Sequence, residues 1–290
     1  MYETGWKRAL VIALFLGPSL IGLGVFVLVP IASSLVLSFA DWDLLNPPRF
    51  TGIANFRRLL ADAEFWGALG NTVKYLVGYV PLVITLGLLI AVALNRRIPL
   101  RSFFRTTYFL PVVTSWVAVS LIWMWLYNPV FGLLNNFLGW LGIRGPAWLF
   151  DVNWAMPAVI LTSVWKDLGF IMVILLAGLQ GIPREYYEAA EIDGASGWQR
   201  LRFITVPLLV PSLFFAVMIS LIGSFQVFDQ VYIMTGGGPA GATQVLMERI
   251  VRNAFNYNRM GYAASMSWIL FLFIFAISFV LNRLRRRWEW

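Results

Sequence analysis

Six long apolar stretches constrain the fold of this chain more than any other feature of its sequence. The first carries no charged residue from Ala9 to Ala40, and about 20 apolar residues are enough for a helix to cross a bilayer. The predicted spans are residues 9–40, 71–94, 108–126, 155–179, 203–228 and 260–281. The sequence therefore predicts an all-α, polytopic membrane protein of about six transmembrane helices.

The composition supports a lipid environment and excludes several kinds of chemistry. The chain is 60% hydrophobic and 12% charged, whereas a soluble protein of 290 residues would need more charge to cover its surface. It contains no cysteine and no histidine, which excludes disulfides, thiol nucleophiles, the usual zinc ligand sets and imidazole catalysis. We therefore predict no catalytic residue and no metal site of these kinds.

Lys7 and Arg8 precede the first apolar stretch, an arrangement that a cleaved signal peptide also shows. This stretch is longer than the apolar part of a signal peptide, and five further spans follow it. We interpret it as a membrane anchor that is retained.

The positive charges of the loops predict the orientation of the chain. Thirteen lie on one side: Lys7, Arg8, Arg96, Arg97, Arg101, Arg105, Arg184, Arg200, Arg202, Arg283, Arg285, Arg286 and Arg287. Seven lie on the other: Arg49, Arg57, Arg58, Arg144, Arg249, Arg252 and Arg259. The richer side should be cytoplasmic, so both termini are expected inside. We interpret the basic clusters at 96–105 and 283–287 as topology determinants and predict no nucleic-acid binding.

Three outer loops carry short structural signals of their own. Residues 41–68 contain turn-forming residues around short helical pieces. Residues 127–154 include Leu133, Leu134, Phe137, Leu138 and Leu141, whose spacing predicts an interfacial helix. Residues 236–260 open with a Gly-Gly-Gly-Pro breaker and continue into an amphipathic segment. Each loop can also be read as a solvated connector.

The cytoplasmic loop 182–202 contains a second amphipathic segment. Pro183 suits the first position of a helix, Glu185 complements its positive end, and Gly194 suits its stop. One stripe of this helix carries Tyr186, Ala189, Ala190 and Asp193, with Glu188 beside it. Such a small-residue stripe would let a partner surface approach closely, although an ordinary amphipathic loop helix is the simpler interpretation.

An ordered series of motifs adds a family resemblance. Glu188-Ala189-Ala190, followed by Gly194 and by Ile204-x-Val206-Pro207, closely resembles the EAA loop of binding-protein-dependent ABC importer permeases. Further similar segments are Phe104–Pro111, Gly132–Asn135, Leu176–Pro183 and Thr235–Pro239. The series resembles the carbohydrate-uptake branch, that is, the maltose-type or glycerol-3-phosphate-type first permease subunit.

The resemblance implies one permease domain over residues 1–290 and a set of partners. These are a pair of ATPase subunits, a second homologous permease, an extracytoplasmic solute-binding protein and the lipid of a bacterial-type inner membrane. The residues implied for coupling to the ATPase are Tyr187, Glu188, Ala189, Ala190, Asp193 and Gly194. Lys7, Lys74 and Lys166 are the only lysines, and none is followed by Ser or Thr as in a phosphate-binding loop. We therefore expect this chain to bind no cofactor, and ATP to bind to the partner subunits.

Charged residues inside spans indicate where the solute could pass, because they usually face a bundle interior or water. Lys166 and Asp167 lie midway along the fourth span, and Asp229 ends the apolar part of the fifth. Neighbouring residues point about 100° apart on a helix, so each should find its own partner; we consider Asp229 as a partner of Lys166. The maltose-type resemblance implies solute contacts at Lys166, Asp167, Phe170, Ser224, Val227 and Asp229. An interhelical ion pair that only holds the bundle remains an alternative.

Aromatic and proline residues in the later spans give two further expectations. Phe170, Phe225, Phe228 and Tyr232 could stack on sugar rings, although packing is the commoner role of such residues. Pro207 and Pro211 permit a kink in the fifth span, and Gly223 and Ser224 could loosen it.

Two other functional classes remain to be weighed. A secondary transporter could use Asp167 or Asp229 as the carrier of a proton or sodium ion, but it leaves the EAA loop unexplained. A membrane-embedded enzyme lacks both His and Cys and has no paired metal spacing. The predicted function is the permease subunit of an ATP-driven importer for a sugar or sugar-like solute.

Overall fold

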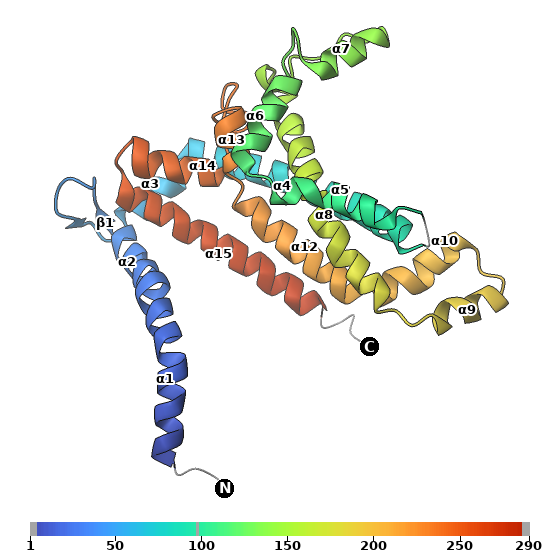
Figure 1. The fold of residues 1–290 in the computed structure, drawn as a ribbon. Helices are drawn as coiled ribbons and strands as arrows, with labels where there is room; N and C mark the ends of the chain where they lie inside the picture. The colour runs from blue at the N-terminus through green and yellow to red at the C-terminus, as the bar shows by residue number, and fades with distance from the viewer. Residues whose placement is uncertain (1–4, 97–98, 286–290) are drawn as a thin grey trace. The chain divides into compact units, whose positions relative to one another are not determined.

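The computed structural model describes residues 5–96 and 99–285, with only the backbone for Lys7, Arg8, Leu284 and Arg285 (Figure 1). Arg97, Arg286 and Arg287, which contribute to the predicted orientation, lie outside the described residues. Internal contacts divide the chain into two compact units. The first is Met1–Asp62 with Ile250–Leu272, and the second is Ala63–Arg249 with Phe273–Trp290.

The first unit contains a long N-terminal helix and a small hairpin. Its elements are α1 (Gly5–Leu23), a π-helical turn (Gly24–Leu28), α2 (Val29–Ser38), β1 (Ala40–Asp41), β2 (Arg49–Phe50), α3 (Ala54–Leu60) and a second π-helical turn (Arg252–Asn256). Strands β1 and β2 pair antiparallel, with Ala40 opposite Phe50. Helices α14 (Leu246–Val251) and α15 (Met260–Arg285) contribute residues to both units.

The second unit holds the remaining helices. They are α4 (Ala63–Asn95), α5 (Arg101–Val113), α6 (Trp116–Leu126), α7 (Leu133–Trp140), a 3-10 turn (Trp148–Phe150), α8 (Ala155–Gln180), α9 (Glu185–Ile192), α10 (Gly197–Arg200), a π-helical turn (Leu201–Thr205), α11 (Val206–Leu208), α12 (Val210–Phe225) and α13 (Asp229–Met234). The helix predicted within residues 127–154 is confirmed as α7, and its position at the membrane interface stays a prediction. The all-α class is also confirmed, because the described strands are two residues long.

Four helices of the described chain are long and apolar enough to cross a membrane by themselves. They are Ala9–Ser38, Ala63–Asn95, Ala155–Gln180 and Met260–Arg283, and two bent pairs raise the number to six if each pair is one span. The first, second, fourth and sixth predicted spans are therefore confirmed as helices. The third and fifth are broken.

The third predicted span, 108–126, is wrong as a single rod. Helices α5 and α6 meet at an angle of 100°, because Thr114 and Ser115 adopt extended backbone angles between them. Pro111 lies in the last turn of α5, and the Ser115 hydroxyl caps α6 by accepting from the Val117 N–H at 3.2 Å. A capping serine directly after a proline-containing turn is a helix start that the apolar pattern conceals.

The fifth predicted span, 203–228, bends where its prolines predicted a kink. The segments Gly197–Leu208 and Val210–Phe225 meet at 71°, with Pro207 and Pro211 on either side of Leu209. A proline cannot donate a backbone hydrogen bond and clashes with the preceding turn, so two of them four residues apart favour a bend between them. The predicted kink is confirmed.

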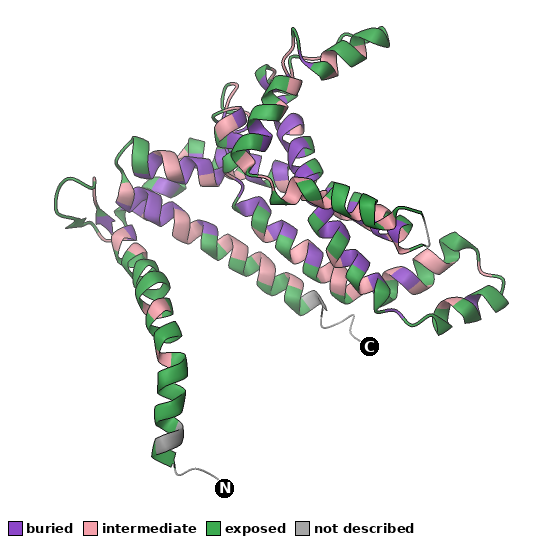
Figure 2. Cartoon of the chain, viewed as in Figure 1, coloured by how far each residue is buried: buried purple, intermediate pink, exposed green. Residues whose placement is uncertain are grey.

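Helix α8 is the centre of the second unit and packs on α4, α5, α6, α12 and α13. The core formed with α4 and α12 includes side chains with no exposed surface, such as Val83, Met172, Leu175 and Leu209. Figure 2 shows α8 largely buried, whereas α7 and α9 are mostly exposed. The N-terminal span Ala9–Ser38 buries none of its apolar window, as expected of a helix whose surroundings are lipid or other subunits.

Candidate functional site

A cavity of about 230 Å³ lies among α4, α6, α8, α12 and α13 of the second unit. Its walls combine aromatic rings, two carboxylates and neutral polar groups. They are formed by Tyr75, Tyr79, Trp116, Asp167, Phe170, Ile171, Ile219, Ser220, Gly223, Gln226, Val227, Phe228, Asp229 and Gln230. Of the six residues predicted for the solute path, the cavity brings together Asp167, Phe170, Val227 and Asp229. Lys166 and Ser224 do not line it.

Asp167 reaches the cavity from α8 and is held by a tyrosine of α4. The Tyr79 hydroxyl donates to Asp167 Oδ2 at 2.8 Å. The ring of Tyr79 stacks on that of Tyr75, with centroids 5.4 Å apart and planes 12° from parallel. Asp167 Oδ1 accepts no hydrogen bond from any described residue, so this oxygen is available to a ligand.

Lys166 points away from Asp167, as their adjacency on one helix predicted. Its Nζ donates to the Val112 carbonyl at 3.2 Å and lies 4.7 Å from the centre of the Trp116 ring. Val112 is in the last turn of α5, where carbonyls lack helical partners and carry partial negative charge. Lys166 therefore stabilises the break between α5 and α6. The pairing of Lys166 with Asp229 considered from the sequence is wrong.

The end of α12 and the start of α13 form the opposite part of the cavity. Ser224 is buried, and its hydroxyl donates to the Ser220 carbonyl at 2.7 Å within α12. The helix ends at Phe225, one residue after the Gly223-Ser224 pair that the sequence identified as a loosening point. Asp229 then begins α13 with an exposed side chain. It makes no hydrogen bond or ion pair to the part of the chain that the structure describes.

The four aromatic residues singled out from the sequence divide into two groups. Phe170 and Phe228 line the cavity. Phe225 is buried at 2% exposure, and Tyr232 stacks on Phe228 with ring centroids 5.1 Å apart. Phe225 is therefore a packing residue. Tyr232 packs on Phe228 and does not itself line the cavity.

Sequence reasoning missed four cavity residues with clear structural roles: Tyr75, Tyr79, Trp116 and Gln230. Gln230 is buried and donates to the Tyr75 hydroxyl at 3.3 Å and to Ser163 Oγ at 3.2 Å. A signal was present, because Tyr75 and Tyr79 are one helical turn apart and share a face within an otherwise apolar span. Trp116 had no such signal, since its position depends on the break before α6.

Helix α9 of the loop 182–202 ends as its sequence predicted. Gly194 has a positive φ of 73°, the Ala195 N–H donates to the Ala190 carbonyl and the Gly194 N–H to the Glu191 carbonyl. This pair of bonds is the Schellman motif, which glycine favours because it has no Cβ to strain the left-handed conformation. Pro183 lies two residues before the helix rather than at its first position.

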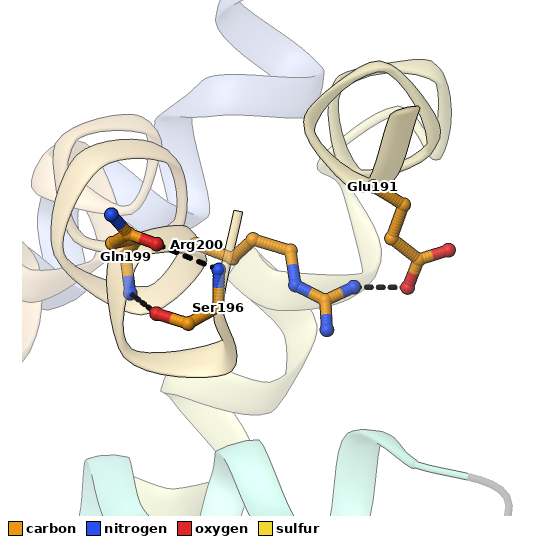
Figure 3. Close-up of polar contacts among 4 residues, drawn as sticks. All are labelled: Glu191, Ser196, Gln199 and Arg200. Carbon is orange, nitrogen blue, oxygen red and sulfur yellow. Dashed lines mark hydrogen bonds and ion pairs between the residues drawn. The ribbon is translucent and has the colours of Figure 1, made fainter. Parts of the chain in front are cut away.

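Two side-chain contacts fix the return segment that follows α9 (Figure 3). Ser196 and Gln199 form a capping box at the start of α10, with bonds of 3.3 and 2.7 Å. Arg200 forms an ion pair with Glu191 of α9. In addition, the Tyr187 and Thr205 hydroxyls are hydrogen-bonded at 3.0 Å. The loop is therefore a folded unit that can transmit a push to the helices on either side.

The exposed face of α9 differs in part from the predicted stripe. Ala190 is buried, at 8% exposure, and Tyr187 is half-buried against the core. Tyr186, Glu188, Ala189 and Asp193 remain exposed. Ile192 is 87% exposed, a large apolar side chain that the sequence reading did not include. Of the predicted coupling residues, Tyr187 and Ala190 thus hold the helix to the chain, and the others are available to a partner.

Known proteins resemble this chain over most of its length. The family model described as "Binding-protein-dependent transport system inner membrane component" matches residues 83–289. The lactose transport system permease protein LacF of Rhizobium radiobacter is 39% identical over 273 residues, covering 92% of this chain and 91% of the relative. The probable starch degradation products transport system permease protein AmyD of Thermoanaerobacterium thermosulfurigenes is 34% identical over 269 residues, covering 92% and 91%.

The same fold occurs in solved transporter structures. A chain of a bacterial ABC transporter involved in the import of the acidic polysaccharide alginate has a TM-score of 0.86 at 25% identity, with 97% of this chain and 96% of that chain covered. A chain of a bacterial alginate ABC transporter in complex with an alginate pentasaccharide-bound periplasmic protein has the same TM-score and coverage at 24% identity.

Proposed function

Because this chain belongs to the family of inner-membrane components of binding-protein-dependent transport systems, we propose that it forms the membrane path of an ATP-driven importer for a sugar or sugar-like solute. The observation that carries this proposal is the placement of α9. This short helix has a polar face with small residues and lies in the loop between α8 and the α10–α12 segment (Figure 1). Helices α8 and α12 also line the cavity.

Helix α9 has the surface needed to engage a separate ATPase. Glu188 is exposed and free to accept charge-assisted bonds from an arginine or lysine of a partner. Ala189 beside it allows close approach, and Ile192 offers a buried anchor once a partner covers it.

Helix α8 and the bent α10–α12 segment both lead from the cavity to the loop that contains α9. Asp167 and Gln180 belong to α8, and thirteen residues at 1.5 Å per residue place them about 20 Å apart. Ser220 lies on α12, whose preceding segment holds Arg200 and Thr205, the partners of α9. A displacement of α9 can therefore reach both sides of the cavity.

A second, homologous permease would complete the path. Lys74 is exposed on α4 inside the predicted span 71–94 and makes no hydrogen bond or ion pair to a described residue. An ammonium group facing lipid is costly, so this face requires a polar covering. We assign that covering to the partner permease.

The remaining partners follow from the transport cycle. A periplasmic binding protein would deliver solute to loops 41–68, 127–154 and 236–260, and the chain would span the inner membrane with both termini inside. ATP would bind to the ATPase pair and no cofactor or metal to this chain. Closure of the ATPases would push α9 and favour the outward-open state, since only contacts that differ between two states can shift their populations.

Uptake by the assembled complex tests the proposal. Affinity purification of this chain should recover an ATPase subunit, and Glu188→Ala should leave assembly intact while lowering transport and stimulated ATP hydrolysis. Glu185→Gln is the matched control, because its exposed side chain makes no hydrogen bond or ion pair to a described residue and is not among the predicted coupling residues. Uptake that survives ATP depletion but stops when the ion gradient is collapsed would instead establish a secondary transporter.

A further inference from the structure

We propose that the cavity selects an uncharged or amino-substituted sugar ring and rejects acidic sugars and polyol phosphates. This specificity rests on the transport function proposed above and goes beyond it, because related importers act on solutes of different charge. Lactose, carried by the system of LacF, is neutral, whereas alginate is an acidic polysaccharide.

The charges at the cavity favour this selection. Asp167 and Asp229 are the charged groups among the lining residues, and neither lysine nor arginine belongs to that set. Lys166 is the neighbouring cation, but its ammonium is engaged by the Val112 carbonyl and the Trp116 ring. A carboxylate or phosphate on a solute would therefore approach two negative groups, the half-buried Asp167 and the exposed Asp229, and like charges repel.

The hydrogen-bonding inventory points the same way. Asp167 Oδ1 and both oxygens of Asp229 have no donor among the described residues, so the cavity offers acceptors and needs donors. Hydroxyl and ammonium groups supply donors, whereas ionised carboxylates and phosphates mainly accept. A sugar hydroxyl matches the cavity and an anionic substituent does not.

Ser220 provides an independent indication that a polar ligand completes the cavity. Its side chain is 4% exposed and lines the wall, yet Oγ has no hydrogen-bond partner in the described chain. Buried hydroxyls are nearly always paired. Because Oγ is itself closed off from the cavity, a rotation of the Ser220 side chain about χ1 would present it to a solute hydroxyl, which would then satisfy it.

The aromatic walls and the size of the cavity indicate a ring as the bound unit. Trp116, Phe170 and Phe228 contribute aromatic side chains to the lining, and aromatic rings suit the apolar face of a pyranose. Pockets for drug-sized ligands enclose about 300–1,000 Å³, so a cavity of about 230 Å³ matches one ring. A longer glycan would place a single residue between the two carboxylates.

Saturation-transfer NMR titrations on the purified full complex test the selection, using four probes at low ionic strength. These are methyl β-glucoside, methyl β-glucosaminide, methyl β-glucuronide and glycerol 3-phosphate. We expect the first two to bind at least tenfold more tightly than the two anions. Equal or tighter binding of either anion, or absence of binding by all four probes, would overturn the inference.

Three variants separate charge selection from a structural effect. Asp229→Asn should reduce the discrimination between glucoside and glucuronide at least threefold, whereas the control Asp41→Asn, at an exposed site outside the cavity, should leave it unchanged. Ser220→Ala should weaken glucoside binding about fivefold without lowering thermal stability, because its hydroxyl has no hydrogen-bond partner among the described residues. Discrimination that is unchanged in Asp229→Asn contradicts the inference. A complex that lacks an ATPase subunit would refute the transport proposal instead.

Discussion

Helix α8 approaches the backbone of α5 closely at Gly169, so the effect of a substitution there on stability can be predicted. A Cβ built at Gly169 would overlap the Tyr108 carbonyl oxygen. It would also lie 2.6 Å from the Tyr108 carbonyl carbon and 2.9 Å from Phe109 Cα, whereas ordinary van der Waals contact begins at 3.4 Å. Substitution by alanine therefore requires the backbone of α5 to retreat by more than about 0.8 Å, since the oxygen is nearer than the carbon. Gly78 of α4 is the matched control, because its Cβ would meet only Ile160, mainly at the terminal Cδ1.

Both substitutions gain about 1 kcal/mol of helix propensity, but their steric costs differ. Overpacking costs about 1–3 kcal/mol, and Gly169→Ala should fall at the upper end because backbone atoms cannot change rotamer. A rotamer change of Ile160 costs about 1 kcal/mol. We therefore expect Gly169→Ala to destabilise the chain by about 2 kcal/mol and Gly78→Ala by about zero.

Thermal unfolding of the purified complex at one fixed scan rate measures this difference. In a chain of this size, about 2 kcal/mol corresponds to an apparent midpoint roughly 4–8 °C lower for Gly169→Ala than for Gly78→Ala. Because α5 leads into α6 and Trp116, solute uptake by Gly169→Ala should also fall. Equal midpoints for the two variants would refute the assignment of a backbone contact at Gly169.

Three further predictions concern single contacts. Tyr79→Phe removes the 2.8 Å hydrogen bond to Asp167. Because a hydrogen bond to a charged group is worth about 1.5–3 kcal/mol, the KM for uptake should rise at least tenfold. An unchanged KM would exclude Asp167 from solute contact. Gly194→Ala places a Cβ at a φ of 73°, at a cost of about 1–2 kcal/mol. Amide hydrogen exchange at residues 190–195 should therefore accelerate roughly tenfold. Unchanged exchange rates would show that α9 does not need glycine at its C-terminal end. Asn135→Ala removes hydrogen bonds to the Pro129 and Pro146 carbonyls and from Trp148 Nε1. Stimulation of ATP hydrolysis by the binding protein should therefore fall while basal hydrolysis persists. Normal stimulation would exclude loop 127–154 from the delivery of solute by the binding protein.

Apolar length alone predicts the spans that are continuous helices, but not the ones that break. The first, second, fourth and sixth predicted spans correspond to continuous helices, and lipid requires backbone hydrogen bonds to be satisfied along a crossing segment. The break at Thr114 and Ser115 is concealed because both residues are neutral and short. Its geometry depends on Ser115 capping α6 and on Lys166 binding the Val112 carbonyl, and the second contact is distant in sequence.

In the candidate site too, features that depend on local sequence could be predicted, whereas those that depend on tertiary packing could not. The end of α9 could be predicted because Gly194 acts through its own backbone conformation. The expected pairing of Lys166 with Asp229 failed, since partner choice depends on which helices approach each other. Ala190 was assigned to the outer stripe because periodicity identifies faces and does not say which face is covered.

The central claim is that α9 lies on the cytoplasmic side and contacts an ATPase. The chain contains no native cysteine, so Ile192→Cys places a single thiol at its 87% exposed position. A thiol-anchored photo-cross-linker on this residue should link the chain to the ATPase subunit, and an impermeant maleimide should label it only after the cells are opened. Labelling in intact cells, or the absence of any cross-linked ATPase in the assembled complex, would contradict the account.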